Sequence, residues 1–98
     1  MIELGGNIVL KGFKERDYAE LIVVKKLVGR YARQLTDHGK EIKTLEVSLR
    51  SHEKGASSLF EIDAHISVGE GSFAASATDR NLFVCLDSAL KKLTAQLP

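Results

Sequence analysis

The stretch Gly69-Glu70-Gly71-Ser72-Phe73-Ala74-Ala75-Ser76-Ala77-Thr78-Asp79 leads into a leucine-rich segment, residues 82–97, and this combination decides the fold. The alternate residues Phe73, Ala75 and Ala77 share one side of a predicted strand. The leucines that follow recur at spacings of three and four, the period of one helix face: Leu82, Leu86, Leu90, Leu93 and Leu97. We expect Asp79 to cap this helix and the helix to fold back over the small residues of the strand.

An earlier segment predicts a second helix. Asp17 and Glu20 have the spacing of a capping box, and the helix should run to about Asp37. One stripe of apolar residues marks its inner face: Leu21, Val24, Val28, Tyr31 and Leu35. Gly39 suits the position after the last turn. Gly29, in mid-helix, costs up to ~1 kcal/mol relative to Ala, which a close approach by another element would explain.

The remaining apolar residues alternate as strands do. One strand is expected within residues 1–13, interrupted or bulged at Gly5-Gly6. Two further strands have alternating apolar residues, Leu45, Val47 and Leu49 in one and Phe60, Ile62, Ala64, Ile66 and Val68 in the other. Residues 51–58 between them read as a polar loop, and Gly69-Glu70-Gly71 reads as a hairpin turn.

The resulting element order is β-α-β-β-β-α, which predicts an α+β fold. A right-handed crossover makes the first two strands parallel, and hairpins make the later ones antiparallel. Because the strands and helices each have one apolar side, we expect a two-layer structure with a four-stranded mixed sheet. Both helices should cover the same face of the sheet, and the other face should meet water. The length predicts a single domain, residues 1–98.

Composition narrows the class of protein. The chain is 44% hydrophobic and 28% charged, ordinary values for a globular protein. No apolar run reaches the ~18 residues that a membrane span needs, and the first residues lack a signal-peptide pattern. The single cysteine, Cys85, cannot form an internal disulfide, so a cytoplasmic location is expected. The net charge of +1 does not itself indicate a nucleic-acid binder, so binding of nucleic acid would have to come from where the basic residues lie.

The basic residues cluster on the two helices. Lys26, Arg30 and Arg33 stand at i, i+4 and i+7, opposite the apolar stripe, with Lys25 beside them. Lys91 and Lys92 lie away from the stripe of the last helix. If the helices are neighbours, these six residues form a basic strip suited to a phosphate backbone. On pattern alone, a solvated helix face is the more frequent explanation. The few aromatic residues fall mostly on inner faces, so such binding should read backbone and shape, not base sequence.

The sequence also resembles a known family. Val68-Gly69-Glu70-Gly71, Ala75-Ser76-Ala77, Asp87 and Lys92-Leu93-Thr94-Ala95-Gln96-Leu97 are similar to motifs of the short ribosome hibernation-promoting factors, the protein Y or ribosome-associated inhibitor family. The resemblance implies the fold just described. It further implies a stress-response factor that binds ribosomal RNA of the small ribosomal subunit through its helical surface and inhibits translation by idle ribosomes.

The residues that carry this resemblance into the site are few. Lys25-Lys26-Leu27 resembles the lysine-rich turn of the family's first helix, and Lys92-Leu93 resembles its Lys-Leu pair. Arg30, Arg33 and Lys91 enter the candidate RNA-binding site on geometry alone. Asp87 matches a family position, and we interpret it as structural. Asp17 stands where the family usually has Thr, and the sequence ends at Pro98, before the basic tail or second domain of many relatives.

Two alternatives come from the residues themselves. Glu61, Asp63 and His65 alternate on one strand face, where carboxylates and an imidazole could move protons or bind a metal. A flat sheet face offers no pocket, however, so we expect no enzymatic activity, catalytic residue, metal or cofactor. The other alternative is a protein-interaction module without ribosome binding, which uses a sheet edge or the polar sheet face. This alternative leaves a homodimer open.

Overall fold

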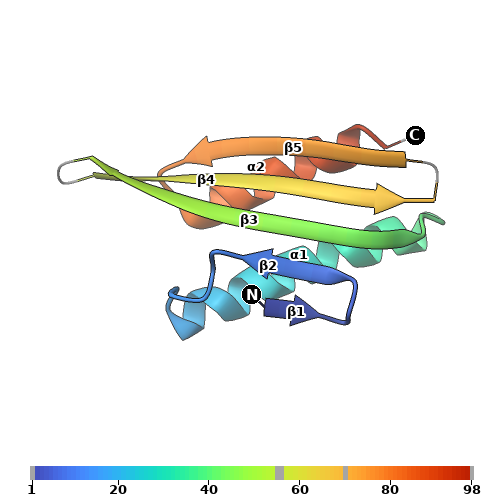
Figure 1. Ribbon diagram of the computed structural model, residues 1–98, viewed down its shortest axis with the longest axis horizontal. Coiled ribbons are helices and arrows are strands. Elements are labelled where there is room, and N and C mark those ends of the chain that lie inside the picture. The colour runs from blue at the N-terminus through green and yellow to red at the C-terminus, as the bar shows by residue number, and fades with distance from the viewer. Residues whose placement is uncertain (1, 55–56, 70, 98) are drawn as a thin grey trace.

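The centre of the molecule is a long antiparallel hairpin formed by β3 (Ile42–Lys54) and β4 (Ser57–Val68). The computed structural model describes residues 2–54, 57–69 and 71–97. β5 (Gly71–Asp79) pairs antiparallel with β4, and β2 (Ile8–Lys11) pairs parallel with β3 (Figure 1). β1 (Ile2–Leu4) completes the sheet beyond β2. The strand order β1-β2-β3-β4-β5 contains the predicted parallel pair and both predicted antiparallel pairs.

The sheet has five strands in the described residues, so the prediction of four was wrong. The expected first strand is instead a small hairpin, in which Ile2 pairs with Leu10 and Leu4 with Ile8. Gly5 and Gly6 have φ angles of 64° and 82°, a conformation that side chains with a Cβ rarely adopt. The two glycines therefore reverse the chain direction, where the sequence indicated an interruption or bulge within one strand.

The predicted polar loop over residues 51–58 is also largely wrong. Ser51 pairs with Phe60 and His52 with Leu59, so β3 and β4 continue well past the last apolar residue of β3. Residues 55 and 56 lie outside the described residues. β5 pairs with β4 from Phe60 onward, so the end of the hairpin extends beyond β5 as a two-stranded ribbon (Figure 1). Residue 70, in the predicted Gly69–Gly71 turn, also lies outside the described residues, and the strands on either side of it pair as expected.

Both helices cover one face of the sheet, as predicted. α1 (Tyr18–Asp37) lies behind the β2–β3 half of the sheet, and α2 (Leu82–Ala95) lies behind β4 and β5 (Figure 1). Apolar side chains of both layers fill the space between sheet and helices. The residues with almost no exposed surface are Leu10, Phe13, Val24, Val28, Leu45, Val47, Ile62, Ala64, Ile66, Cys85, Leu86, Ala89, Leu90 and Leu93. The small inner face of β5 lets α2 approach closely, and Ala77 is buried there.

The helices begin and end with capping residues, and one of these differs from the residue predicted from the sequence. α1 starts after Asp17, whose backbone N–H donates to Glu20 Oε1 at 3.3 Å. At its other end Gly39 has φ 83°, and the N–H groups of Gly39 and Lys40 donate to carbonyls of the last turn. α2 is capped by Asn81 and not by Asp79, the cap expected from the sequence. Asn81 Oδ1 accepts from the N–H groups of the first turn at 2.9 and 3.0 Å.

Asp79 supports the cap from two residues before it: its Oδ1 accepts from the backbone N–H of Asn81 at 2.8 Å and so positions the capping residue.

Two glycines differ in whether a side chain could replace them. A Cβ on Gly12, which has φ 81°, would overlap the carbonyl oxygen of Leu49, so only glycine lets this connection pass so close to β3. Gly29 is exposed and has no heavy atom within 4 Å of an added Cβ, so no close approach explains its place in α1.

Candidate nucleic-acid interface

The outward face of α1 presents three basic residues. At about 100° per residue, Lys26, Arg30 and Arg33 fall within an arc of about 60°, and all three are exposed. The residues that α1 buries, Val24, Val28, Ala32 and Leu35, define the opposite side, against the sheet. Because the sheet and core fix this rotation of the helix, the three cations point to solvent together, as predicted.

One polar contact joins the two helices. The hydroxyl of Tyr31, on α1, donates to Asp87 Oδ1, on α2, at 2.7 Å. Desolvation and this hydrogen bond, with the added repulsion of the Asp87 charge, raise the pKa of Tyr31 to about 12, and only Arg30 opposes them. The structural interpretation of Asp87 made from the sequence agrees with this contact. The predicted basic strip required the two helices to be neighbours, and α1 and α2 are in direct contact.

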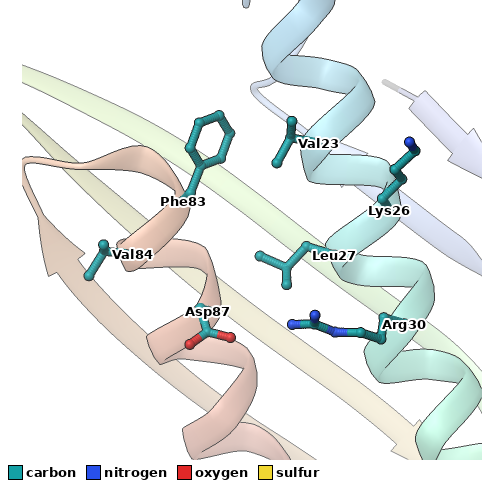
Figure 2. Close-up of a pocket in the computed structure, with 7 residues that line it drawn as sticks. All are labelled: Val23, Lys26, Leu27, Arg30, Phe83, Val84 and Asp87. Atoms are coloured by element: carbon teal, nitrogen blue, oxygen red, sulfur yellow. The ribbon is translucent and has the colours of Figure 1, made fainter.

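A groove of about 570 Å³ runs between the helices beside this contact. Its surface is mostly apolar, and Figure 2 shows the residues that line it: Val23, Lys26, Leu27 and Arg30 from α1, and Phe83, Val84 and Asp87 from α2. Arg30 extends from α1 toward α2 (Figure 2), with its guanidinium carbon 5.8 Å from the centre of the Tyr31 ring. The α1 wall is thus cationic, whereas the α2 wall is apolar with a single carboxylate.

Sequence reasoning identified the two cations of the groove but not its apolar lining. Val23 and Val84, which belong to that lining, are 44% and 51% exposed. Val23 widens the apolar stripe of α1, and Val84 lies off the leucine stripe of α2. These apolar residues outside the main stripes were the signal in the sequence that could have indicated the lining. The pattern alone does not bring Val23 and Val84 together, because it does not show that the two helices are neighbours.

The other three candidate residues lie around this centre. Lys91 follows Asp87 by about one turn of α2, so it lies on the outward side next to the groove, and it is exposed. Lys25 is exposed on the flank of α1 away from α2. Lys92 lies on the far side of α2: its Nζ is 3.4 Å from the carbonyl oxygen of Ser76, on β5. The structure therefore places Lys26, Arg30, Arg33 and Lys91 on the outward side of the two helices, and Lys25 and Lys92 at the two outer flanks.

Lys92 has a neighbour with the same contact pattern. Gln96, the residue that follows α2, donates from Nε2 to the carbonyl oxygen of Ala74 at 2.6 Å, so two side chains at this end of the helix bind alternate carbonyls of β5. β5 is the last strand of the sheet, and free backbone groups on such an edge can pair with another chain. The Lys92–Gln96 part of the family-like motif therefore has a structural role, in which it covers part of an open sheet edge.

Charge is divided between the two sides of the molecule. The helices carry six basic and three acidic side chains, a formal charge of +3, although the whole chain has only +1. Among the described residues, none of the six candidate cations has a carboxylate oxygen within 4.0 Å. Two cations on the open sheet face are paired instead, Lys11 with Glu46 at 3.0 Å and Arg50 with Asp63 at 2.6 Å. The helical surface is therefore positive although the net charge of the whole chain is close to zero.

The residues considered for catalysis lie on that open sheet face. Glu61 Oε1 is 3.1 Å from His52 Nε2 and 4.0 Å from Arg50 Nε, and Asp63 binds Arg50. A shallow hollow of about 390 Å³, lined in part by Asp63 and His65, lies nearby, although the sequence predicted no pocket here. Within residues 2–54, 57–69 and 71–97, no group of three or more His, Cys, Asp or Glu residues could hold a metal ion.

Two other features bear on function. Cys85 is fully buried, its Sγ lies 3.3 Å from the carbonyl oxygen of Ala77, and burial raises the pKa of the thiol. A thiol that is inaccessible and protonated is a poor nucleophile. In the part of the chain that the structure describes, neither helix has the length and apolar character to cross a membrane.

Comparison with known proteins gives fold relatives only. No family model and no curated protein sequence matches the chain. A ribosomal subunit interface protein from Coxiella burnetii has a solved structure that matches with a TM-score of 0.64 and 18% identity, covering 93% of this chain and 90% of that one. The N-terminal domain of Protein Y from Thermus thermophilus matches with a TM-score of 0.55 and 20% identity, covering 91% and 90%. At these identities the likeness shows a shared fold, and it confirms at that level the resemblance to the protein Y family that the sequence predicted.

Proposed function

We propose that this protein is a cytoplasmic, non-enzymatic RNA-binding factor that docks its helical face on the small ribosomal subunit and inhibits translation by idle ribosomes. The observation that carries the proposal is the set of exposed cations on the outward side of α1 and α2, which have no carboxylate partner in the part of the chain that the structure describes. The two fold relatives, a ribosomal subunit interface protein and Protein Y, support the choice of partner.

The chemistry of the surface suits RNA phosphates. Unpaired ammonium and guanidinium groups do not have to break an ion pair before they meet a phosphate, and released counterions supply much of the affinity. Lys26, Arg30 and Arg33 would follow the backbone along α1, while Lys91 would add a contact from α2. Lys25 and Lys92 extend the surface at its flanks, and the Lys92 ammonium can still donate to a phosphate besides Ser76.

In this proposal inhibition results from occupied space. A protein about 44 Å long and 24 Å wide that lies on the subunit interface would exclude mRNA and tRNA from the same region. Nothing in this mechanism requires a cofactor, a metal or a bond-forming step. Release should depend on ionic strength, because the affinity would come largely from phosphate contacts.

The direct test is sedimentation of the protein with purified ribosomes and separated subunits from starved cells, at low and at high salt. We expect the protein to pellet with ribosomes and with the small subunit at low salt, to leave them at high salt, and to inhibit a cell-free translation reaction. If the protein stays in the supernatant at every salt concentration, the proposed function is wrong.

The alternative, an interaction module that pairs through its sheet edge, now meets a specific obstacle. Two carbonyls of the β5 edge already accept hydrogen bonds from Lys92 and Gln96. A partner strand would have to displace both side chains. A dimer insensitive to salt and without affinity for RNA would nevertheless favour this alternative over ribosome binding.

A further inference from the structure

We infer that the groove between α1 and α2 binds a single unpaired nucleotide of the RNA, with its base against the apolar lining and its phosphate on the α1 wall. The inference rests on the proposed function and adds to it a ligand class and a defined site. Sequence reasoning predicted contacts with backbone and shape only, since it found no exposed pair of aromatic rings. The apolar lining of the groove adds a contact for the base.

The lining has the composition of a base-binding surface. Leu27 and Phe83, both half-buried, and the exposed Val23 lie between the two helices, and the exposed Val84 lines the groove from the outer side of α2 (Figure 2). A nucleobase is flat and weakly polar on its faces, so it gains by covering apolar side chains that are otherwise in contact with water. The groove has a volume of about 570 Å³ and is open to solvent, so a base can reach the lining from the surface.

Charge sets the direction in which the nucleotide lies. Lys26 and Arg30 give the α1 wall its positive charge: the Arg30 guanidinium extends into the groove, and the Lys26 ammonium points away from α2 (Figure 2). Asp87 stands on the α2 wall and repels a phosphate, but its carboxylate can accept hydrogen bonds from amino or imino groups on a base edge. One wall therefore suits the anionic end of a nucleotide and the other suits its base.

This asymmetry distinguishes the proposed ligand from other occupants. A fully paired RNA helix keeps its bases stacked and offers only backbone to a surface, which would leave the apolar lining uncovered. An acidic peptide would satisfy Lys26 and Arg30, but it would set carboxylates near Asp87. An unpaired nucleotide covers the lining and meets both charged walls.

The test compares two RNA duplexes that differ in one base. Both carry a single bulged nucleotide, and in one of them the base of that nucleotide is removed, so the number of phosphates is the same. Affinities are measured by fluorescence anisotropy at one fixed salt concentration. We expect the wild-type protein to bind the duplex with the intact bulge roughly tenfold more tightly, as is typical of one base contact.

Three variants assign this preference to the groove. The double variant Val23→Ser/Val84→Ser should lose the tenfold preference and keep the affinity for the abasic duplex. The control Ile22→Ser changes an apolar residue that is 38% exposed, next to Val23 but outside the groove lining, and should keep the preference. The variant Lys26→Gln/Arg30→Gln should weaken binding of both duplexes. Circular dichroism melting checks that each variant is folded.

The outcomes separate the inference from the proposed function. Equal affinity of the wild type for the two duplexes, including no measurable affinity for either, overturns the inference, whereas salt-sensitive pelleting with ribosomes would still support the proposed function. Loss of ribosome binding in Val23→Ser/Val84→Ser with unchanged RNA affinity also overturns it, and assigns the groove to a ribosomal protein. Absence of binding to ribosomes and to both RNAs overturns both proposals.

Discussion

The contact that joins the two helices makes stability depend on pH in a way that can be measured. Desolvation of Tyr31, its hydrogen bond to Asp87 at 2.7 Å and the charge of Asp87 raise its pKa from 10.0 to about 12. A raised pKa means that the folded state holds the tyrosine proton more tightly than the unfolded state does. The stabilisation is therefore complete below pH 10 and is lost as the pH rises from 10 through 12.

The magnitude follows from the shift and from the surroundings of Tyr31. A shift of two pH units corresponds to at most ~2.7 kcal/mol. Tyr31 is only half-buried, so water screens part of the interaction, and we expect about 1 kcal/mol. The variant Tyr31→Phe should accordingly be less stable than the wild type by about 1 kcal/mol at neutral pH, which lowers Tm by roughly 4–8 °C in a domain of this size.

Two measurements test this prediction. Urea unfolding of the wild type and of Tyr31→Phe, from neutral pH to above pH 12, should show a stability difference that shrinks between pH 10 and 12. Other titrating groups are common to both proteins and cancel in the difference. In the Tyr18→Phe background Tyr31 is the only tyrosine, and its absorbance should titrate near pH 12. A stability difference that is constant with pH, or a titration midpoint unaffected by Asp87→Ala, would refute this account.

Three further predictions concern the fold. Gly29→Ala should raise the free energy of unfolding by up to ~1 kcal/mol in urea titrations, because the position is exposed, helical and open. Gly12→Ala should lower it by more than about 2 kcal/mol, because a positive φ and an overlap with the β3 backbone act together; no change would show that this connection can move away from β3. Lys92→Ala/Gln96→Ala should uncover carbonyls of β5 and increase self-association in analytical ultracentrifugation, while the control Lys91→Ala remains as the wild type. A double variant that self-associates no more than the wild type would show that the two side chains do not protect the edge.

Periodicity predicted most of the fold because burial imposes it directly. The leucine spacing of α2 and the alternation in β4 each have one buried side, and both elements were found where expected. The β1–β2 hairpin was missed because interruption by Gly5-Gly6 is compatible with a bulge or with a turn. Only the backbone φ angles distinguish the two. The extension of β3 and β4 was missed because polar residues past the core pair without an apolar alternation.

The candidate site was predictable to the extent that it lies on one helix. Lys26, Arg30 and Arg33 share a face by helix geometry alone, and the stripe of α1 fixed which face. Lys91 and Lys92 are about 100° apart on α2, so which of them lies beside α1 depends on the order of the helices over the sheet. The groove depends on contacts between residues more than fifty positions apart, and no local pattern contains that information. Sequence resemblance suggested the fold of a ribosome-associated family, and the solved structures share that fold.

The central claim is that cations on the outward face of α1 bind RNA phosphates. The most direct measurement is the slope of log affinity against log salt concentration for ribosome binding by Lys26→Gln/Arg30→Gln. Its matched control is Lys11→Gln/Arg50→Gln, which removes the same charge from the open sheet face. At about 0.7–0.9 per phosphate contact, we predict that the slope of the α1 variant falls by about 1.5 and that the slope of the control is unchanged. Equal slopes for the two variants would contradict the account.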